Sequence, residues 1–127
     1  MKGKHLIAGK WVGSEEHFPN VPVNGQAEIF ASGSPALVDE AVRAAEAAFE
    51  SYAATSRINR AAFIYSIAEE IEARAEQITE MGTRETGLPA MRLQGERGRT
   101  VGQLKLFADH IKEGEYLDRR FDEALPE

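Results

Sequence analysis

The stretch from Arg84 to Ile111 constrains the fold most, because it contains the end of one helix, a break and the start of another. Glycine at a helix end and proline shortly beyond it are typical stop signals, and Gly87, Leu88 and Pro89 supply them. After the break, apolar residues return at helical spacing on a face that we expect to pack: Leu93, Thr100, Leu104, Phe107, Ala108 and Ile111. The stretch therefore predicts a mainly helical fold interrupted at residues 87–89.

A second face of the later helix carries polar side chains at positions i, i+4, i+7 and i+11, namely Arg92, Glu96, Arg99 and Gln103. Two interpretations are open. These side chains either form an ion-pair network around Glu96, or Arg92, Arg99 and Gln103 bind the carboxylate of a ligand, for which a guanidinium offers a matching fork. The residues alone favour the ion-pair network.

A third face carries Gly95, Gly98 and Gly102. Each glycine inside a helix costs roughly 1 kcal/mol relative to alanine, so three on one face need a reason. We expect another helix or a ligand to come within backbone distance there.

Composition excludes several classes of function. With 127 residues, the chain has the size of one domain. Its formal charge of −6 and pI near 5.2 disfavour nucleic acid and anionic membrane surfaces as partners. There is no apolar run of ~18 residues and no signal-peptide pattern, so we expect a cytoplasmic protein. The absence of cysteine excludes disulfides, thiolate metal sites and thiol nucleophiles from this chain.

Two β-hairpins are predicted before the helices. The first joins His5–Ile7 to Trp11–Val12 through a glycine turn, with Trp11 as its apolar anchor. The second joins residues 18–23 to residues 26–30 through Asn24-Gly25, a dipeptide typical of tight turns.

Three helices are predicted after the hairpins. Ser34 caps the first and Pro35 occupies its first position, and its buried stripe is Val38, Ala41, Val42, Ala45, Ala48, Phe49 and Tyr52. Thr55 or Ser56 caps the second, which we expect to run unbroken past Gly82 to Gly87. Arg57 and Arg60 oppose the dipole at its start, which predicts carboxylate partners for them elsewhere. The third helix runs from residue 90 to residue 114, and residues 115–121 could be extended.

The sequence contains few residue patterns that indicate a metal site, a nucleotide-binding loop or a catalytic nucleophile. His5, His17 and His110 lie far apart in the sequence, so surface imidazoles are the simpler interpretation than metal ligands. Gly95 to Gly98 lacks the spacing of a dinucleotide-binding loop and no predicted strand precedes it. No serine lies in a nucleophile elbow.

Several segments nevertheless resemble a known family. The runs LIAGKWV, PALVDEAVRAAEAAF and Glu85-Thr86-Gly87-Leu88-Pro89 resemble the N-terminal part of the aldehyde dehydrogenase superfamily. The run LPAMRLQGERGRTVGQLKLFADHIKEGEYLDRR resembles the branch that oxidises 2-oxoglutarate semialdehyde (2,5-dioxopentanoate) to 2-oxoglutarate. The similarity extends from about Leu6 to Pro126.

The resemblance implies that residues 1–127 are the N-terminal hairpin and three-helix segment of an α/β enzyme, part of its cofactor-binding domain. It places the cysteine nucleophile, the glutamate base, the oxyanion asparagine and the NAD or NADP site after residue 127, so the chain alone should be inactive. It also implies that Arg99 lies near the substrate entrance, with Arg92 and Gln103 on the same face. The implied partners are the remainder of the enzyme, a semialdehyde acid and further copies in a homo-oligomer.

Three functions are therefore open. The first is the N-terminal part of a 2-oxoglutarate semialdehyde dehydrogenase. The second is the same class of enzyme acting on a fatty or other aliphatic aldehyde, with structural arginines. The third is a non-catalytic helical interaction domain whose glycine face binds another protein.

Overall fold

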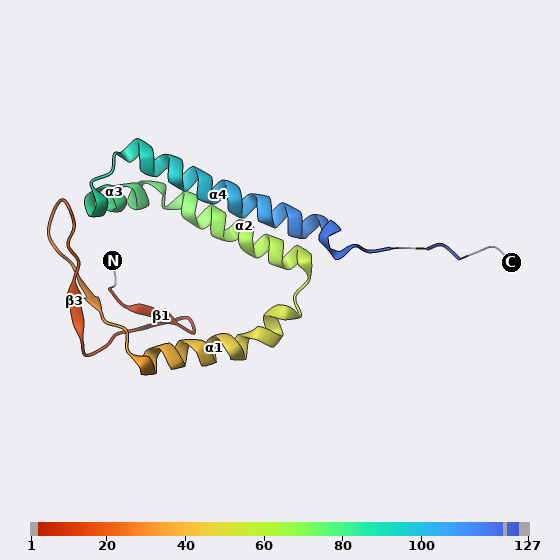
Figure 1. Ribbon diagram of the computed structural model, residues 1–127, viewed down its shortest axis with the longest axis horizontal. Helices are drawn as coiled ribbons and strands as arrows, with labels where there is room; N and C mark the ends of the chain where they lie inside the picture. The colour runs from red at the N-terminus through yellow and green to blue at the C-terminus, as the bar shows by residue number, and fades with distance from the viewer. Residues whose placement is uncertain (1–2, 121, 125–127) are drawn as a thin grey trace. The chain divides into compact units, whose positions relative to one another are not determined.

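A computed structural model describes residues 3–120 and 122–124 (Figure 1). These residues form four α-helices, two antiparallel strand pairs and one short 3-10 helix, so the predicted mainly helical fold with N-terminal hairpins is confirmed. The chain divides into two compact units. The first comprises Met1–Thr55 and Glu76–Leu93, and the second comprises Ser56–Ala75 and Gln94–Glu127.

The first hairpin pairs β1 (His5–Ile7) with β2 (Lys10–Val12), as predicted. Ala8 and Gly9 form its two-residue loop and both have positive φ, which is the conformation of the turn that matches the twist of paired strands. Its buried residue is Ile7, whereas Trp11 is exposed. The prediction of Trp11 as the anchor is therefore wrong, because it lies on the opposite face from Ile7.

The second hairpin is shorter than predicted. β3 (His17–Pro19) pairs with β4 (Ile29–Ala31), with Phe18 opposite Phe30. Asn24-Gly25 does not join the strands directly but lies within a loop of residues 20–28. Two backbone amides of this loop bond outside the hairpin. Val23 N and Asn24 N donate to the carbonyl oxygens of Glu85 and Arg84, at 3.3 and 3.0 Å.

Helix α1 (Pro35–Ala53) begins as predicted. The Ser34 hydroxyl accepts a hydrogen bond from Leu37 N at 3.3 Å, and proline occupies the first turn. The predicted burial of its apolar stripe is wrong, because none of its 19 residues, all of them described, is buried. The strand that α1 contacts, β1, covers only part of the helix.

The predicted second helix is divided in two. α2 (Arg57–Ala73) is capped by Ser56, whose hydroxyl accepts from Asn59 N at 3.1 Å. At Arg74 the backbone leaves helical geometry, with φ −107° and ψ 19°, before α3 (Ala75–Thr86) begins. The prediction of one unbroken helix was wrong because apolar spacing continues across the break. Gly87 ends α3 as predicted, with φ +71°.

Helix α4 (Ala90–Glu113) matches its predicted bounds and lies beside α2 in the second unit (Figure 1). Its buried residues are Val101 and Ala108, and those of α2 are Ala61 and Ala68. The predicted packing face is confirmed at Ala108. It is wrong at Thr100 and Phe107, which are exposed, and it lacked Val101.

The ends of these two helices meet through Arg57. Its Nη1 donates to the carbonyl oxygens of Lys112 and Glu113, the latter at 2.9 Å. Arg57 was expected to pair with a carboxylate, but carbonyls at the negative end of the α4 dipole take that place. The predicted extended segment is also wrong at Glu115–Leu117, which forms the 3-10 helix, while Phe121 lies outside the described residues.

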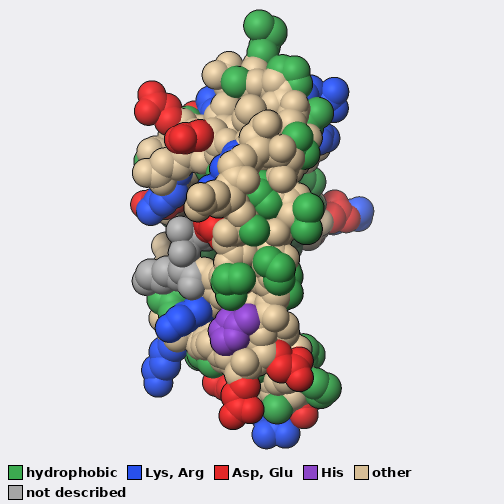
Figure 2. Space-filling view, turned by 90° about the vertical axis from the view of Figure 1, so that its left-hand side faces the viewer, with side chains coloured by type: hydrophobic (Ala, Val, Ile, Leu, Met, Phe, Trp, Pro, Cys, Tyr) green, Lys and Arg blue, Asp and Glu red, His purple; other side chains and the backbone are tan. Residues whose placement is uncertain are grey.

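Much apolar surface is open. Figure 2 shows hydrophobic side chains spread over the face that it presents. Phe49, Phe63, Leu106 and Phe107 are all more than half exposed. Among the residues that the structure describes, no helix is both long enough and apolar enough to cross a membrane.

Candidate functional site

Arg99 lies on the surface of α4 beside Glu96. Its Nε and Nη2 donate to Glu96 Oε2 at 3.2 and 2.7 Å. The two side chains are 69% and 39% exposed, so the pair contributes at most about 1 kcal/mol to stability. This geometry agrees with the ion-pair interpretation for Arg99 and leaves the guanidinium accessible to a ligand.

The other two predicted site residues are also on α4 and exposed. Gln103 belongs to the second unit with Arg99, whereas Arg92 belongs to the first. The binding of a carboxylate by Arg92, Arg99 and Gln103 remains a prediction.

The glycine face of α4 is open within the described part of the chain. A Cβ atom built on Gly95, Gly98 or Gly102 would meet no heavy atom within 4 Å. The described residues therefore do not make the close approach that we expected there. These glycines also lie within a continuous helix and not at a strand-to-helix turn, so this segment does not fit the phosphates of a nucleotide cofactor.

Arg97 has a structural position that the sequence interpretation missed. Its Nε lies 3.7 Å from Glu72 Oε2, its Nη1 donates to the Ala75 carbonyl at 3.4 Å, and its side chain is only 19% exposed. The spacing contains the signal, because Arg97 is four residues from both Leu93 and Val101 on the packed face.

A second polar group, the Arg84 cluster, consists of Asn20, Glu28, Arg84 and Glu85. Asn20 Nδ2 donates to both carboxylate oxygens of Glu85 at 2.8 and 3.0 Å, and Asn20 Oδ1 accepts from Glu28 N at 2.6 Å. Arg84 Nη2 lies 2.8 Å from Glu28 Oε1 and 3.0 Å from Glu85 Oε1. The four residues thus form a closed ring, which passes through the Glu28 backbone amide and attaches the base of the 20–28 loop to the end of α3.

The hydrogen bonds of this ring stabilise the charged form of Arg84. Hydrogen bonding to Glu28, and then to Glu85, raises the pKa of Arg84 above its ordinary value. Arg84 therefore stays a cation and cannot serve as a proton donor near neutral pH. Its role is to hold the loop, together with the backbone bonds of Val23 and Asn24 to the last carbonyls of α3.

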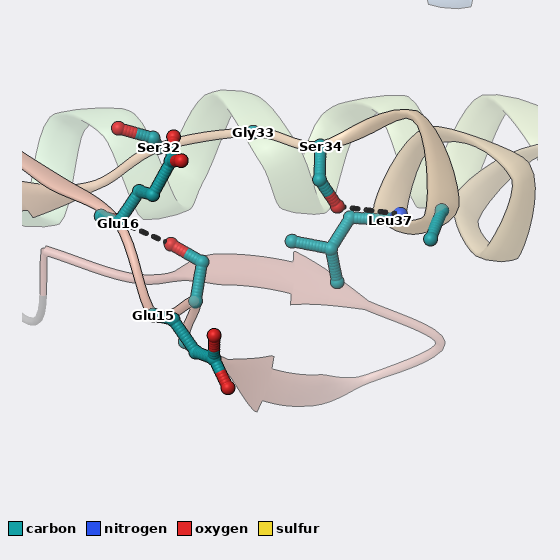
Figure 3. Close-up of a pocket in the computed structure, with 9 residues that line it drawn as sticks. Glu15, Glu16, Ser32, Gly33, Ser34 and Leu37 are labelled. Atoms are coloured by element: carbon teal, nitrogen blue, oxygen red, sulfur yellow. Dashed lines mark hydrogen bonds between the residues drawn. The ribbon is translucent and has the colours of Figure 1, made fainter.

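A depression of about 420 Å³ lies beside the start of α1 (Figure 3). It is lined by Gly13, Ser14, Glu15, Glu16, Ser32, Gly33, Ser34, Ala36 and Leu37. A helix start attracts anions, but here Ser34 already accepts from Leu37 N, and two carboxylates line the same depression. We therefore assign no anion site there.

The three histidines have separate local environments. A ring nitrogen of His5 lies 3.3 Å from the Ser32 carbonyl oxygen, and one of His17 lies 3.1 Å from that of Glu15. His110, in the second unit, has its ring centre 5.4 Å from that of Tyr116.

Curated relatives resemble most of this chain. Alpha-ketoglutaric semialdehyde dehydrogenase 2 of Azospirillum brasilense is 46% identical over 100 residues, which are 79% of this chain and 19% of the relative. Alpha-ketoglutaric semialdehyde dehydrogenase of Acinetobacter baylyi is 43% identical over 99 residues, with coverages of 78% and 19%. The chain therefore spans about a fifth of the length of these relatives.

A solved structure has the same arrangement of elements. The NAD-dependent benzaldehyde dehydrogenase of Corynebacterium glutamicum matches with a TM-score of 0.82 and 30% identity, over 88% of this chain and 25% of that one. The sequence model of the aldehyde dehydrogenase family matches residues 12–122. The chain thus belongs to the aldehyde dehydrogenase family.

Proposed function

We propose that this chain is the N-terminal part of an NAD(P)-dependent aldehyde dehydrogenase that oxidises 2-oxoglutarate semialdehyde to 2-oxoglutarate. The observation that carries the proposal is the 46% and 43% identity to two relatives with that activity in their names. We also propose a cytoplasmic homo-oligomer, as the family resemblance implies.

The reactive groups are proposed to lie in other parts of the enzyme. Oxidation through a thiohemiacetal needs a thiol, and this sequence has no cysteine. The family resemblance assigns NAD or NADP to segments outside this chain, and the glycine-bearing part of α4 does not fit a nucleotide. The chain by itself is then inactive.

The proposed contribution of this chain is recognition of the substrate carboxylate. Arg99, with Arg92 and Gln103, is the candidate group. Glu96 already occupies one edge of the Arg99 guanidinium, so a substrate carboxylate must share that cation or displace Glu96. Displacement is cheap because the pair is exposed.

The test is Arg99→Ala in the complete enzyme that contains this segment. Loss of a charge-assisted hydrogen bond to a carboxylate costs roughly 1.5–3 kcal/mol. We therefore expect KM for the semialdehyde acid to rise by about 10- to 100-fold, with a much smaller change for a neutral aldehyde of equal length. Steady-state kinetics with both substrates measures the difference.

Arg74→Ala is the matched control. Arg74 also forms an exposed pair with a glutamate, Glu70, but it follows the last residue of α2 and is not part of α4. Arg74→Ala should leave KM unchanged for both the semialdehyde acid and the neutral aldehyde. Equal effects of Arg99→Ala on the two substrates would contradict a carboxylate role.

A dehydrogenase for fatty or other aliphatic aldehydes is the second candidate. The Arg99–Glu96 pair favours it, because that pair accounts for the arginine without a ligand. The kinetic comparison above separates the two candidates.

A further inference from the structure

Asn24 and Gly25 form an exposed pair in the loop of residues 20–28. Within the described part of the chain, no hydrogen bond holds the Asn24 side chain or the backbone nitrogen of Gly25. Gly25 has φ +87° and no Cβ atom to shield that nitrogen. Asparagine is a labile residue, because the next backbone nitrogen can attack the carbon of its side-chain amide. The structure leaves both reacting groups of this pair accessible.

Asn20 has the opposite environment. Its Nδ2 donates to both carboxylate oxygens of Glu85, at 2.8 and 3.0 Å, and its Oδ1 accepts from Glu28 N at 2.6 Å. These bonds fix the side chain, so its amide carbon is not free to turn onto the next backbone nitrogen. That nitrogen belongs to Val21, whose β-branched side chain crowds it. We therefore expect Asn20 to be stable.

Asn59 is protected by its helix. It lies in the first turn of α2, where its backbone nitrogen donates to the Ser56 hydroxyl at 3.1 Å. The next nitrogen, Arg60 N, donates to the Ser56 carbonyl at 3.0 Å and is held in the helix. The sequence contains no further asparagine, so the structure leaves Asn24 as the reactive one.

We propose that Asn24 is a site of spontaneous covalent modification. The backbone nitrogen of Gly25 bonds to Cγ of Asn24, the bond between Cγ and Nδ2 breaks, and ammonia leaves with the proton of the Gly25 amide. The succinimide ring that remains takes up one water molecule. Water opens the ring at Cγ to give aspartate, or at the backbone carbonyl carbon to give isoaspartate, whose main chain runs through the former side chain. No oxidant, reductant or cofactor is needed.

The product places a new carboxylate where the loop is attached. Asn24 N donates to the Arg84 carbonyl and Val23 N to the Glu85 carbonyl, at the end of α3. That end carries the negative pole of the helix dipole, so a carboxylate beside it is unfavourable. Arg84 does not compensate, because its Nη2 already lies 2.8 Å from Glu28 Oε1 and 3.0 Å from Glu85 Oε1. Isoaspartate also lengthens the main chain of the loop by one carbon atom, so modification weakens the attachment of the loop to α3.

The test follows the intact 127-residue chain at mildly alkaline pH by peptide mapping with mass spectrometry. Each converted asparagine gives its peptide a small, fixed gain in mass, and an endoproteinase that cleaves at aspartate but not at isoaspartate distinguishes the products. We expect Asn24 to convert at least about tenfold faster than Asn20 or Asn59, which corresponds to a barrier lower by about 1.4 kcal/mol. Equal rates at the three asparagines would overturn the proposal.

Asn24→Gln and Asn24→Asp are the matched variants. Glutamine keeps the amide but would have to close a larger ring, so Asn24→Gln should abolish the mass gain at this position. Asn24→Asp carries the charge of the product from the start. Hydrogen exchange at the Val23 amide should be faster in Asn24→Asp and in the aged chain, and unchanged in Asn24→Gln. Unchanged exchange in the aged chain would overturn the proposed effect on the loop.

The Arg84 cluster should slow the reaction, because Asn24 Cγ can turn onto Gly25 N only when the loop leaves its held position. A free peptide of residues 20–28 lacks the cluster and should convert several-fold faster than the intact chain. Asn20→Ala should move the chain toward the rate of the peptide. An intact chain that already converts as fast as the peptide would contradict control by the fold. These measurements need no aldehyde, so the carboxylate proposal can fail while this one holds.

Discussion

Gly87 and Gly98 show how one substitution can have opposite effects at two sites. Gly87 has φ +71°, and a Cβ there would lie 3.1 Å from Val23 Cγ1. Gly98 lies within α4 and a Cβ there meets no described atom within 4 Å. We expect Gly87→Ala to lower the free energy of unfolding of the chain by about 1–2 kcal/mol, because the left-handed conformation strains alanine.

Gly98→Ala should instead raise that free energy by about 1 kcal/mol, because alanine favours the helix. Urea unfolding followed by circular dichroism measures both changes. Destabilisation by Gly98→Ala would show that the glycine face is already closely approached in the free chain.

Tyr65 predicts a dependence of stability on alkaline pH. Its hydroxyl donates to Asp109 Oδ1. This hydrogen bond, with smaller contributions from burial and the charge of Asp109, raises the pKa of Tyr65 above its ordinary value. The folded state therefore holds the phenol proton more tightly than the unfolded state. The stabilisation is complete below the unfolded pKa of about 10 and is lost as pH rises through the folded pKa.

The comparison is wild type against Tyr65→Phe across that range. The stability advantage of the wild type should shrink with rising pH, and ultraviolet titration should show one late-ionising tyrosine that Asp109→Asn returns toward normal. A constant difference between the two proteins at every pH would contradict the hydrogen bond.

Local residue roles could be predicted and distant partners could not. Ser34 and Ser56 act as caps because a hydroxyl and an amide three residues later are all that a cap requires. Arg57 lies at the positive end of the α2 dipole, which indicated that it needs a partner. The partners are carbonyl oxygens of α4, and the sequence could not show that they are not carboxylates. Arg97 was missed because a charged residue on a packed face contradicts simple apolar spacing.

At the scale of elements, the Arg84 cluster connects a loop to a helix end. Asn20 is its central residue, because it contacts both Glu28 and Glu85. Asn20→Ala should lower the free energy of unfolding by about 1–3 kcal/mol, since it leaves partly buried polar groups without a partner. Asn20→Asp should cost more, because it places a carboxylate against Glu85.

Hydrogen exchange at the amides of Val23 and Asn24 is the direct measurement, and both should exchange faster. Asn24→Ala is the control, because Asn24 donates to Arg84 through its backbone amide, which alanine keeps. Unchanged exchange in Asn20→Ala would mean that the loop is held without the ring.

Apolar periodicity predicted which segments are helices and strands, but it did not predict where all of them begin, end and connect. The start of α1, the end of α3 and both ends of α4 carry glycine, proline or serine signals, and these bounds were predicted closely. The break at Arg74 carries no such signal, so α2 and α3 were predicted as one helix. Asn24-Gly25 suggested a tight turn, yet tertiary bonds to α3 opened it into a longer loop.

For the molecule as a whole, the described core is small. Its buried hydrophobic residues are Ile7, Ala31, Ala61, Ala68, Val101 and Ala108, and no large side chain among the described residues is fully buried. Alanines bury little apolar surface each, so the hydrophobic term is weak. We therefore predict that the free chain associates, with a broad thermal transition that shifts with protein concentration.

Sedimentation velocity and calorimetry over a range of concentrations test this. A sharp transition at one temperature for every concentration would instead support an autonomous domain, as the helical interaction domain requires. The amphipathic pattern of α1 was correct from the sequence, but its burial could not be predicted, because the sequence identifies an apolar face and not its partner.

The loop of residues 20–28 is a suitable place to attach a fluorescent label. Its base is held by the Arg84 cluster, while Gln26 and Ala27 are exposed. Because the sequence contains no cysteine, Gln26→Cys would give a chain with a single thiol. A fluorophore attached there would report on assembly of this segment from a position that the fold itself does not use.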